Sequence, residues 1–227
     1  MPHKVLTWAR IREHFRKYMA IYIVGLVICV LLTNLVYTST TPRTPYDQEV
    51  LIYLADAYTN TQPLDDLAAE ALAFGQEGDE TLLEVNFESL QFVDPEQDYT
   101  SSMLLMARLS LGEADVFFAS GVCMESLCAS EAFEPLDSYL AEGWMDGLDL
   151  EPYYCTSAET GETWIAGLKL DNVPGLAEIG AFDNSGAVLV ITANSTNADT
   201  SMQVAEYIIR ELMEGDYVSA HSPEPAA

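Results

Sequence analysis

Basic residues are scarce beyond residue 37, where only Arg43, Arg108, Lys169 and Arg210 accompany all but one of the 36 acidic residues. This part of the chain therefore has a formal charge of −31. Such an excess argues against nucleic acid, or an anionic membrane surface, as a partner bound by charge. The acidic residues are spread without a block, and 49% of the whole chain is hydrophobic. We therefore predict a folded acidic domain suited to basic or cationic partners.

Histidine is almost absent from the same region, where His221 is the sole example. No Gly-x-Ser-x-Gly or His-Glu-x-x-His pattern occurs, so histidine-based catalysis is disfavoured and we predict a protein that is not an enzyme. The alternating acids of 94–98 resemble a calcium loop, but Tyr99 and Leu105 occupy the positions that need Gly and Glu. We predict no metal and no cofactor.

Cysteine is also rare: Cys29 is in an apolar run, and Cys123, Cys128 and Cys155 follow it. Three thiols cannot all pair within one chain. One bridge can form, best between Cys155 and one of the other two, because a helical spacing of five puts Cys123 and Cys128 on different faces. Buried free thiols are the alternative, and we favour it.

An uncharged apolar run of 20 residues covers 18–37. At about 1.5 Å per residue, a helix of this length spans the roughly 30 Å hydrocarbon core of a bilayer. Tyr18, Tyr22 and Tyr37 lie near its ends, where their rings favour the interface. The run predicts a transmembrane helix over 18–37 with the lipid bilayer as its partner.

The segment before this run, 1–17, is basic and has a formal charge of +4. The positive-inside bias therefore predicts a single-pass protein of the cell membrane, with 1–17 in the cytoplasm and the C-terminal domain outside. The alternative is a cleaved signal peptide. The run is longer than a signal core, and 38–42 offers a poor cleavage site.

Beyond the span we predict an extended linker over 38–47, one domain over 48–216 and a disordered tail over 217–227. Apolar patterning predicts strands at 50–55, 82–87, 114–119, 163–170 and 186–192. Helices are predicted at 65–74, ended by Gly75, then at 99–111, 124–130 and 201–213, with a short helix inside 133–140. Residues 143–160 read as irregular. This alternation predicts an α/β domain whose largely parallel sheet is covered by helices on both faces.

Several segments together resemble the extracellular solute-binding proteins of ABC importers. They are Leu-Gly-Glu-Ala-Asp-Val-Phe-Phe-Ala at 111–119, Glu-Ala-Phe-Glu-Pro-Leu-Asp-Ser-Tyr-Leu at 131–140, Gly-Glu-Thr-Trp-Ile-Ala-Gly-Leu-Lys-Leu at 161–170, and Val-Leu-Val-Ile-Thr-Ala-Asn-Ser at 188–195 with the helix ending at 207–212. The resemblance implies a three-layer lobe like one lobe of a type II solute-binding protein. The whole chain is also similar to single-pass membrane proteins of Clostridia with a reduced ectodomain.

The departure from that family concerns the second lobe. Only 171–185 separate the hinge-like strand from the late strand, where the family places most of its second lobe. The resemblance therefore implies a single lobe without the large cleft that closes over a solute.

Ligands of open α/β sheets bind beyond the carboxyl ends of the strands. We therefore predict a ligand-binding face from the polar or small residues that follow the predicted strands, with ordinary loop residues as the alternative. The candidates are Asp56, Tyr58, Ser120, Gly121, Asp171, Asn172, Asn194 and Ser195. Trp164 could stack on a ligand, although a tryptophan in mid-strand is more often a core residue.

The predicted function is that of a membrane-anchored, extracellular, non-enzymatic binding protein. Its partner would be a membrane protein, and an accessory role beside a transporter is one form of this hypothesis. The alternative is a lone-lobe receptor for a small or cationic solute.

Overall fold

The computed structural model describes residues 8–40, 44–92, 99–128, 132–157, 160–214 and 216–221. It divides into two compact units, Met1–Arg43 and Thr44–Ala227. We call the second unit the lobe. The start of the predicted basic segment (1–7), part of the predicted linker (41–43) and the end of the predicted tail (222–227) lie outside the described residues.

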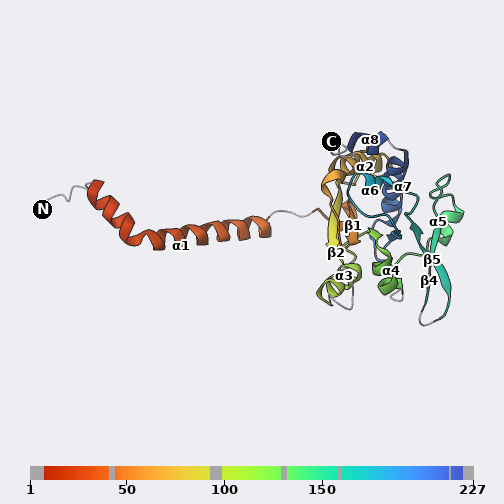
Figure 1. Cartoon of the computed structure of the whole chain (residues 1–227), viewed down its shortest axis with the longest axis horizontal. Coiled ribbons are helices and arrows are strands. Elements are labelled where there is room, and N and C mark those ends of the chain that lie inside the picture. Colours follow the sequence, from red (N-terminus) through yellow and green to blue (C-terminus); the bar gives the residue numbers. More distant parts are fainter. Residues whose placement is uncertain are drawn as a thin grey trace, which may run out of the picture. The chain divides into compact units, whose positions relative to one another are not determined.

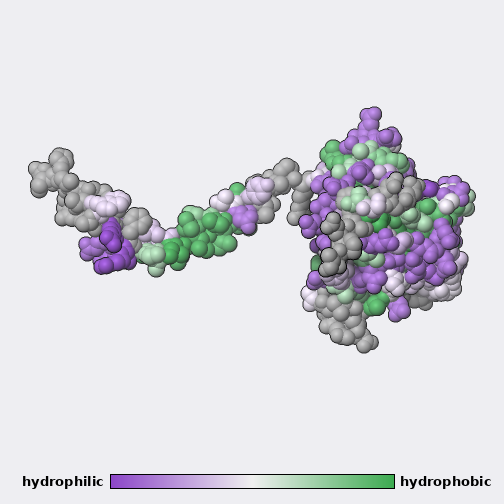
Figure 2. Space-filling model, turned by 45° about the horizontal axis from the view of Figure 1, so that its top comes forward, coloured by the Kyte–Doolittle hydropathy of each residue, from purple (hydrophilic) through white to green (hydrophobic). Residues whose placement is uncertain are grey.

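The first unit is the helix α1 (Trp8–Thr40). Within it, the 22-residue stretch Arg16–Tyr37 contains an 18-residue window with a mean hydropathy of 2.5, of which no residue is buried. This stretch is long and apolar enough to cross a membrane, a property that spans and signal sequences share. Figure 2 shows the hydrophobic surface of its middle part, in contrast to the mainly hydrophilic lobe.

The linker predicted over 38–47 is shorter than expected. Residues 38–40 continue α1, because this part of the chain contains no glycine or proline. The first residue that disfavours continuation of the helix is Pro42. On the other side, Tyr46–Gln48 forms a 3-10 turn, and the Thr44 hydroxyl donates to Glu84 Oε2 at 2.6 Å. Only 41–43 therefore separate α1 from the lobe.

The lobe contains one six-stranded sheet in the order β2-β1-β3-β6-β5-β4. The strands are β1 (Glu49–Asp56), β2 (Glu84–Gln91), β3 (Val116–Ala119), β4 (Pro152–Thr156), β5 (Thr163–Lys169) and β6 (Val188–Ile191). Five of the six lie at or near predicted positions. The sixth, β4, falls in the stretch predicted to be irregular. It begins with Pro152, which lacks a backbone N–H, and a proline is tolerated there because β4 is an edge strand.

We had expected a largely parallel sheet, but the sheet is mixed. β1 runs parallel to β2 and β3, whereas β6 is antiparallel to β3, β5 to β6 and β4 to β5. A parallel neighbour requires a crossover that returns the chain to the starting edge. The six residues between β4 and β5 are too few for such a return. The connection from β5 to β6, over 170–187, includes α6 but re-enters the sheet at the edge where β5 ended, since Lys169 pairs with Val188.

Helices cover both faces of the sheet, which confirms the predicted three-layer α/β lobe (Figure 1). One side carries α2 (Asp65–Gly78), α6 (Gly175–Glu178), α7 (Ala198–Glu214) and α8 (Asp216–His221). The other side carries α3 (Tyr99–Leu111) and α4 (Gly121–Leu127), and α5 (Asp137–Ala141) precedes β4 in the chain.

Strand β1 divides the core between these two sides. Val50, Ile52 and Leu54 pack among α2 and α7, whereas Leu51 and Tyr53 pack among α3 and α4. Successive side chains of a strand alternate between faces, so a central strand covered on both sides is apolar throughout. Burial of each such side chain contributes about 1.5–3 kcal/mol.

Two helices depart from their predicted form. α2 does not end at Gly75 but continues to Gly78, and Gly75 is buried where an added Cβ would lie 2.6 Å from Leu82 and 3.1 Å from Val204. The glycine therefore allows close packing inside the helix rather than ending it. α3 packs through Leu105 and Leu109, so the predicted apolar face of Met103, Leu104, Ala107 and Leu111 faces solvent.

The predicted disordered tail begins as helix α8. Tyr217 and Val218 are about 5% exposed and belong to the core on the α2 side. The Tyr217 hydroxyl donates to the Pro63 carbonyl at 2.7 Å and accepts from the Leu67 backbone N–H at 3.2 Å. Two apolar residues in a polar segment give too little periodicity to predict a helix. Their burial is therefore visible only in the structure, where they pack into the core on the α2 side.

Candidate functional site

Six of the eight predicted site residues share one edge of the sheet. Because β5 is antiparallel to β6 and β6 is antiparallel to β3, the carboxyl ends of β1, β3 and β5 meet there. Asp56 ends β1, Ser120 follows β3 and Asp171 follows β5. Tyr58, Gly121 and Asn172 belong to the same turns. We call this side the carboxyl edge.

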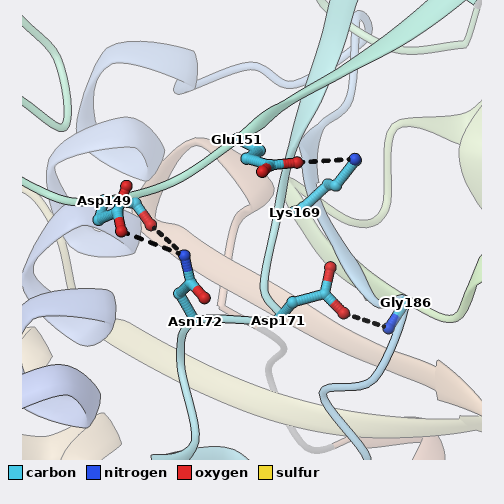
Figure 3. Close-up of polar contacts among 6 residues, drawn as sticks. All are labelled: Asp149, Glu151, Lys169, Asp171, Asn172 and Gly186. Carbon is cyan, nitrogen blue, oxygen red and sulfur yellow. Dashed lines mark hydrogen bonds and ion pairs between the residues drawn. The ribbon is translucent and has the colours of Figure 1, made fainter.

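The polar groups after β5 hold neighbouring loops. The Gly186 backbone N–H donates to Asp171 Oδ1 at 2.8 Å, and Asn172 Nδ2 donates to the Asp149 carbonyl at 3.0 Å and to Asp149 Oδ2 at 3.4 Å (Figure 3). Asp171 and Asn172 therefore stabilise the loops in which they lie.

A small cavity of about 280 Å³ opens among Glu151, Lys169, Asp171 and Asn172. Lys169 Nζ forms an ion pair with Glu151 Oε2 at 2.9 Å, and this pairing raises the pKa of Lys169 (Figure 3). We had not predicted Glu151 or Lys169 as site residues, although a lysine in so acidic a domain was a signal. The cavity has room for a small polar group.

The β1 end of this edge is acidic. Burial raises the pKa of Asp56, the Ala57 backbone N–H opposes this shift, and the negative charge of Asp183 raises the pKa further. An added Cβ on Gly121 would lie 3.2 Å from the Gly186 carbonyl oxygen, so the turn into α4 abuts the loop before β6. The edge therefore brings carboxylates together and favours positively charged ligands.

The other two predicted residues, Asn194 and Ser195, lie at the opposite edge. They follow β6, which runs against β3, so its carboxyl end meets the amino end of β3. There the Ser195 hydroxyl donates to Asp115 Oδ1 at 2.6 Å, and Asn194 Nδ2 donates to the Leu109 carbonyl at 3.4 Å. The prediction that all eight residues form one face is wrong, because it assumed a parallel β6.

Asp115 is a buried polar residue that we had not singled out. It is 4% exposed, and its Oδ2 accepts from the Leu51 backbone N–H at 2.9 Å. Burial raises its pKa to about 6, against the two hydrogen bonds that lower it. Both carboxylate oxygens bond within the protein, so Asp115 joins β1 to the turn after β6. An acid inside an apolar run was the available signal.

A larger cavity of about 640 Å³ lies where β5 and β6 separate. Segment 132–136 enters this gap: Phe133 bridges to Thr192, and the Leu136 N–H donates to the Ile165 carbonyl at 2.8 Å. The half-buried Trp164 lines the cavity, and its buried Nε1 has no hydrogen-bond partner in the described part of the chain. The lining residues are Phe133, Pro135, Ser157, Thr160, Glu162, Thr163, Trp164 and Ala193.

One disulfide joins Cys128, after α4, to Cys155 in β4, with the Cα atoms 5.3 Å apart. The prediction of a single bridge through Cys155 is confirmed. The alternative that we favoured, in which the thiols are free, is wrong for Cys128 and Cys155. Cys123 is a buried thiol whose pKa burial raises to about 12. Among the described residues no cluster of three or more metal-ligating side chains occurs, and the acidic stretch 94–98 lies outside them.

No protein-family model matches this sequence, and no curated protein matches it as a relative. A structural similarity extends to the N-glycan transport solute-binding protein NgtS from Streptococcus pneumoniae, with 19% identity and a TM-score of 0.29. The similarity covers 44% of this chain and 21% of NgtS. The chain thus spans about a fifth of the length of that protein.

Proposed function

We propose that this chain is a membrane-anchored, extracellular and non-enzymatic binding protein whose lobe recognises a positively charged partner. The observation that carries the proposal is how the few cations of the lobe are used. Arg108 pairs with Glu88 at 3.0 Å, Lys169 with Glu151 at 2.9 Å and Arg210 with Glu206 at 2.6 Å. The lobe has no further Lys or Arg to neutralise its other carboxylates.

The consequence of this charge distribution is a negative field around the lobe. Such a field attracts cationic partners, speeds their association and weakens as salt is added. The carboxyl edge adds a local concentration of carboxylates at the place where open α/β sheets bind ligands.

The anchor is supported by the length and apolarity of α1 and by the basic residues before it. The Cys128–Cys155 bridge also fits an oxidising compartment outside the cytoplasm. Because only 41–43 separate α1 from the lobe, an anchored α1 would keep the lobe beside the membrane. A membrane protein, such as a transporter that the lobe assists, is therefore the expected class of partner.

The topology is tested on the full chain expressed in intact cells. External protease should digest the lobe and leave an N-terminal tag protected, and the mass of the mature protein should include α1. A protected lobe would contradict the orientation, and a mature chain that starts after residue 37 would show that α1 is a removed signal.

The binding proposal is tested with the full chain in zwitterionic lipid nanodiscs. An oligolysine peptide should bind at low salt and dissociate as NaCl is raised, and an oligoglutamate peptide of equal length should not bind. Absence of oligolysine binding at low salt would contradict recognition of a positive partner. Crosslinking in membranes followed by mass spectrometry should then recover a neighbouring membrane protein, and recovery of this chain alone would count against that partner.

A second candidate function, a lone-lobe receptor for a small or cationic solute, is favoured by the 640 Å³ cavity with Trp164 and Phe133 in its wall. Aromatic rings bind cations and the apolar faces of small solutes. Thermal-shift screening with choline, spermidine, amino acids and sugars should then find a stabilising solute. Trp164→Ala should abolish the shift, and Trp144→Phe, a change to an indole outside the cavity, should retain it. If no solute stabilises the protein, this second function is rejected.

A further inference from the structure

The outward side of α3 is an apolar surface that the fold of the lobe does not use. Met103 is 55% exposed, Leu104 46%, Met106 40% and Leu111 68%. Ala107 lies exposed among them. We call these five residues the α3 apolar face.

Packing of the lobe does not account for this face. The core side of α3 is formed by Leu105 and Leu109. Met103, Leu104, Ala107 and Leu111 lie on the other side of the helix, and the 40% exposed Met106 flanks the core side next to them. Arg108 is the only charged residue of α3, and it is bound to Glu88 and placed 4.9 Å from the centre of the Tyr53 ring. The helix therefore turns its charge toward the sheet and its methionines and leucines outward, which is the reverse of an ordinary amphipathic surface helix.

Among the described residues of the lobe, no other helix or strand exposes more than one large apolar side chain. Isolated residues of this kind are normal on a protein surface, whereas a contiguous patch indicates an interaction site. The single ones lie on different elements and turns: Tyr46, Tyr58, Phe74, Leu83, Val122 and Tyr154. Four large exposed apolar residues on one 13-residue helix are therefore distinctive.

We propose that the α3 apolar face is the docking surface for a basic amphipathic helix of a partner protein. This inference rests on the proposed function, because it names the chemistry of the positive partner. The apolar stripe of the partner helix would cover the methionines and leucines, and methionine adapts readily to such a helix. Its Lys and Arg residues would meet the carboxylates of the lobe.

Charge complementarity selects this occupant over the alternatives. Residues 44–227 hold three basic and 35 acidic side chains, so the lobe has a formal charge of −32. A second copy would bring the same charge against it, and an anionic lipid surface would also be repelled. In contrast, a basic helix gains from both the apolar face and the surrounding charge.

The test uses the full chain in zwitterionic nanodiscs and an 18-residue Leu/Lys peptide with its leucines at helical spacing. A scrambled peptide of identical composition has the same charge but no apolar stripe. The double variant Met103→Glu/Met106→Glu is compared with Leu83→Glu/Tyr154→Glu, which adds the same charge at exposed apolar positions outside α3 and outside the carboxyl edge. Circular dichroism of each variant verifies that the lobe is folded.

At 150 mM NaCl we expect the wild type and the Leu83/Tyr154 variant to bind the striped peptide equally. The Met103/Met106 variant should bind it at least about tenfold more weakly, and so should the wild type with the scrambled peptide. If the Met103/Met106 variant binds like the wild type, the inference is overturned while charge-driven binding stands. If the wild type binds neither peptide even at low salt, both proposals fail. If the wild type self-associates through this face and excludes the peptide, a second copy is the occupant and the inference is overturned.

Discussion

Asp115 joins β1 to the turn after β6 at the sheet edge opposite the carboxyl edge, and its contribution to the free energy of unfolding depends on pH. It accepts from the Leu51 N–H and the Ser195 hydroxyl, yet it is 4% exposed and its pKa is raised to about 6. The folded state therefore binds a proton on the Asp115 carboxylate more tightly than the unfolded state does. Its contribution to stability is complete below the unfolded pKa of 3.8 and is lost as the pH rises through about 6.

We predict that Asp115→Asn removes this pH dependence. Relative to the wild type, the variant should gain about 2 kcal/mol of unfolding free energy between pH 4.5 and pH 7.5. Urea unfolding across this range measures the difference. Asp79→Asn is the control of opposite sign: hydrogen bonds from Thr81 lower the pKa of Asp79, so that substitution should cost more at neutral pH than in acid. A pH-independent difference for Asp115→Asn would contradict the shift.

A second residue-scale prediction concerns Gly112, which ends α3 as expected from the sequence. Its φ is +63°, and an added Cβ would lie 2.6 Å from the Asn194 backbone oxygen. Gly112→Ala should therefore cost about 2 kcal/mol or more. Gly180→Ala is the control, because its φ is +72° and no atom lies within 4 Å of the added Cβ. Equal losses in urea unfolding would show that the contact with Asn194 is unimportant.

At the scale of elements, the disulfide and α8 attach peripheral segments to the core. The bridge fastens β4, an edge strand with a neighbour on one side only, to the segment after α4. α8 inserts Tyr217 at the start of α2, where Leu64 provides no side-chain cap. The Leu67 N–H is one of the first-turn donors that lack a helical acceptor, so the Tyr217 hydroxyl takes the role of a cap.

Removal of the bridge by Cys128→Ala/Cys155→Ala should lower the unfolding free energy by about 3 kcal/mol, because it frees a loop between residues 27 apart in sequence. Urea unfolding of the wild type with and without reductant provides the comparison. The reduced wild type should match the double variant, and Cys123→Ala should remain sensitive to reductant. A wild type that unfolds identically in both conditions would contradict a stabilising bridge.

Tyr217→Phe should cost about 1–2 kcal/mol, since it leaves the Leu67 N–H and the Pro63 carbonyl without their partner. Tyr154→Phe, at a side chain that is 57% exposed, is the matched control and should be neutral. Thermal unfolding of the two variants distinguishes a docked α8 from a disordered tail, for which both changes would be neutral.

At the scale of the whole molecule, the charge of the lobe dominates. Its three cations are already paired, so most of the repulsion among the carboxylates is uncompensated within the chain. Repulsion of this kind destabilises the compact state and is screened by salt. The same excess charge underlies the proposed recognition of a positive partner.

We predict that raising NaCl from about 20 to about 300 mM, which shortens the screening length several-fold, increases the melting temperature of the full chain by several degrees. Sucrose at equal osmolarity separates screening from excluded-solute effects. If NaCl leaves the melting temperature unchanged or lowers it, carboxylate repulsion does not limit the stability of the lobe.

Much of the element pattern was predictable from the sequence because it depends on local signals. The apolar run 50–55 and the helix ended by Gly112 are examples, since a buried strand and a left-handed glycine leave clear marks in sequence. The outward face of α3 and the extent of α2 were not predictable. α3 is apolar on both sides, so periodicity cannot choose its core face, and the role of Gly75 depends on Leu82 and Val204.

The sequence by itself determined the apolar stretch of α1, the acidity that follows it and the α/β class of the lobe. These depend on composition and periodicity, which need no knowledge of distant contacts. Only the tertiary structure decided which candidate residues share a site. The direction of a strand depends on the edge of the sheet at which the preceding connection re-enters it. The reversal of β6 left Asp56, Ser120 and Asp171 at one edge and moved Ser195 to Asp115 at the other. Contact between segments distant in sequence likewise selected Cys128 as the partner of Cys155 and left the apolar face of α3 exposed to solvent.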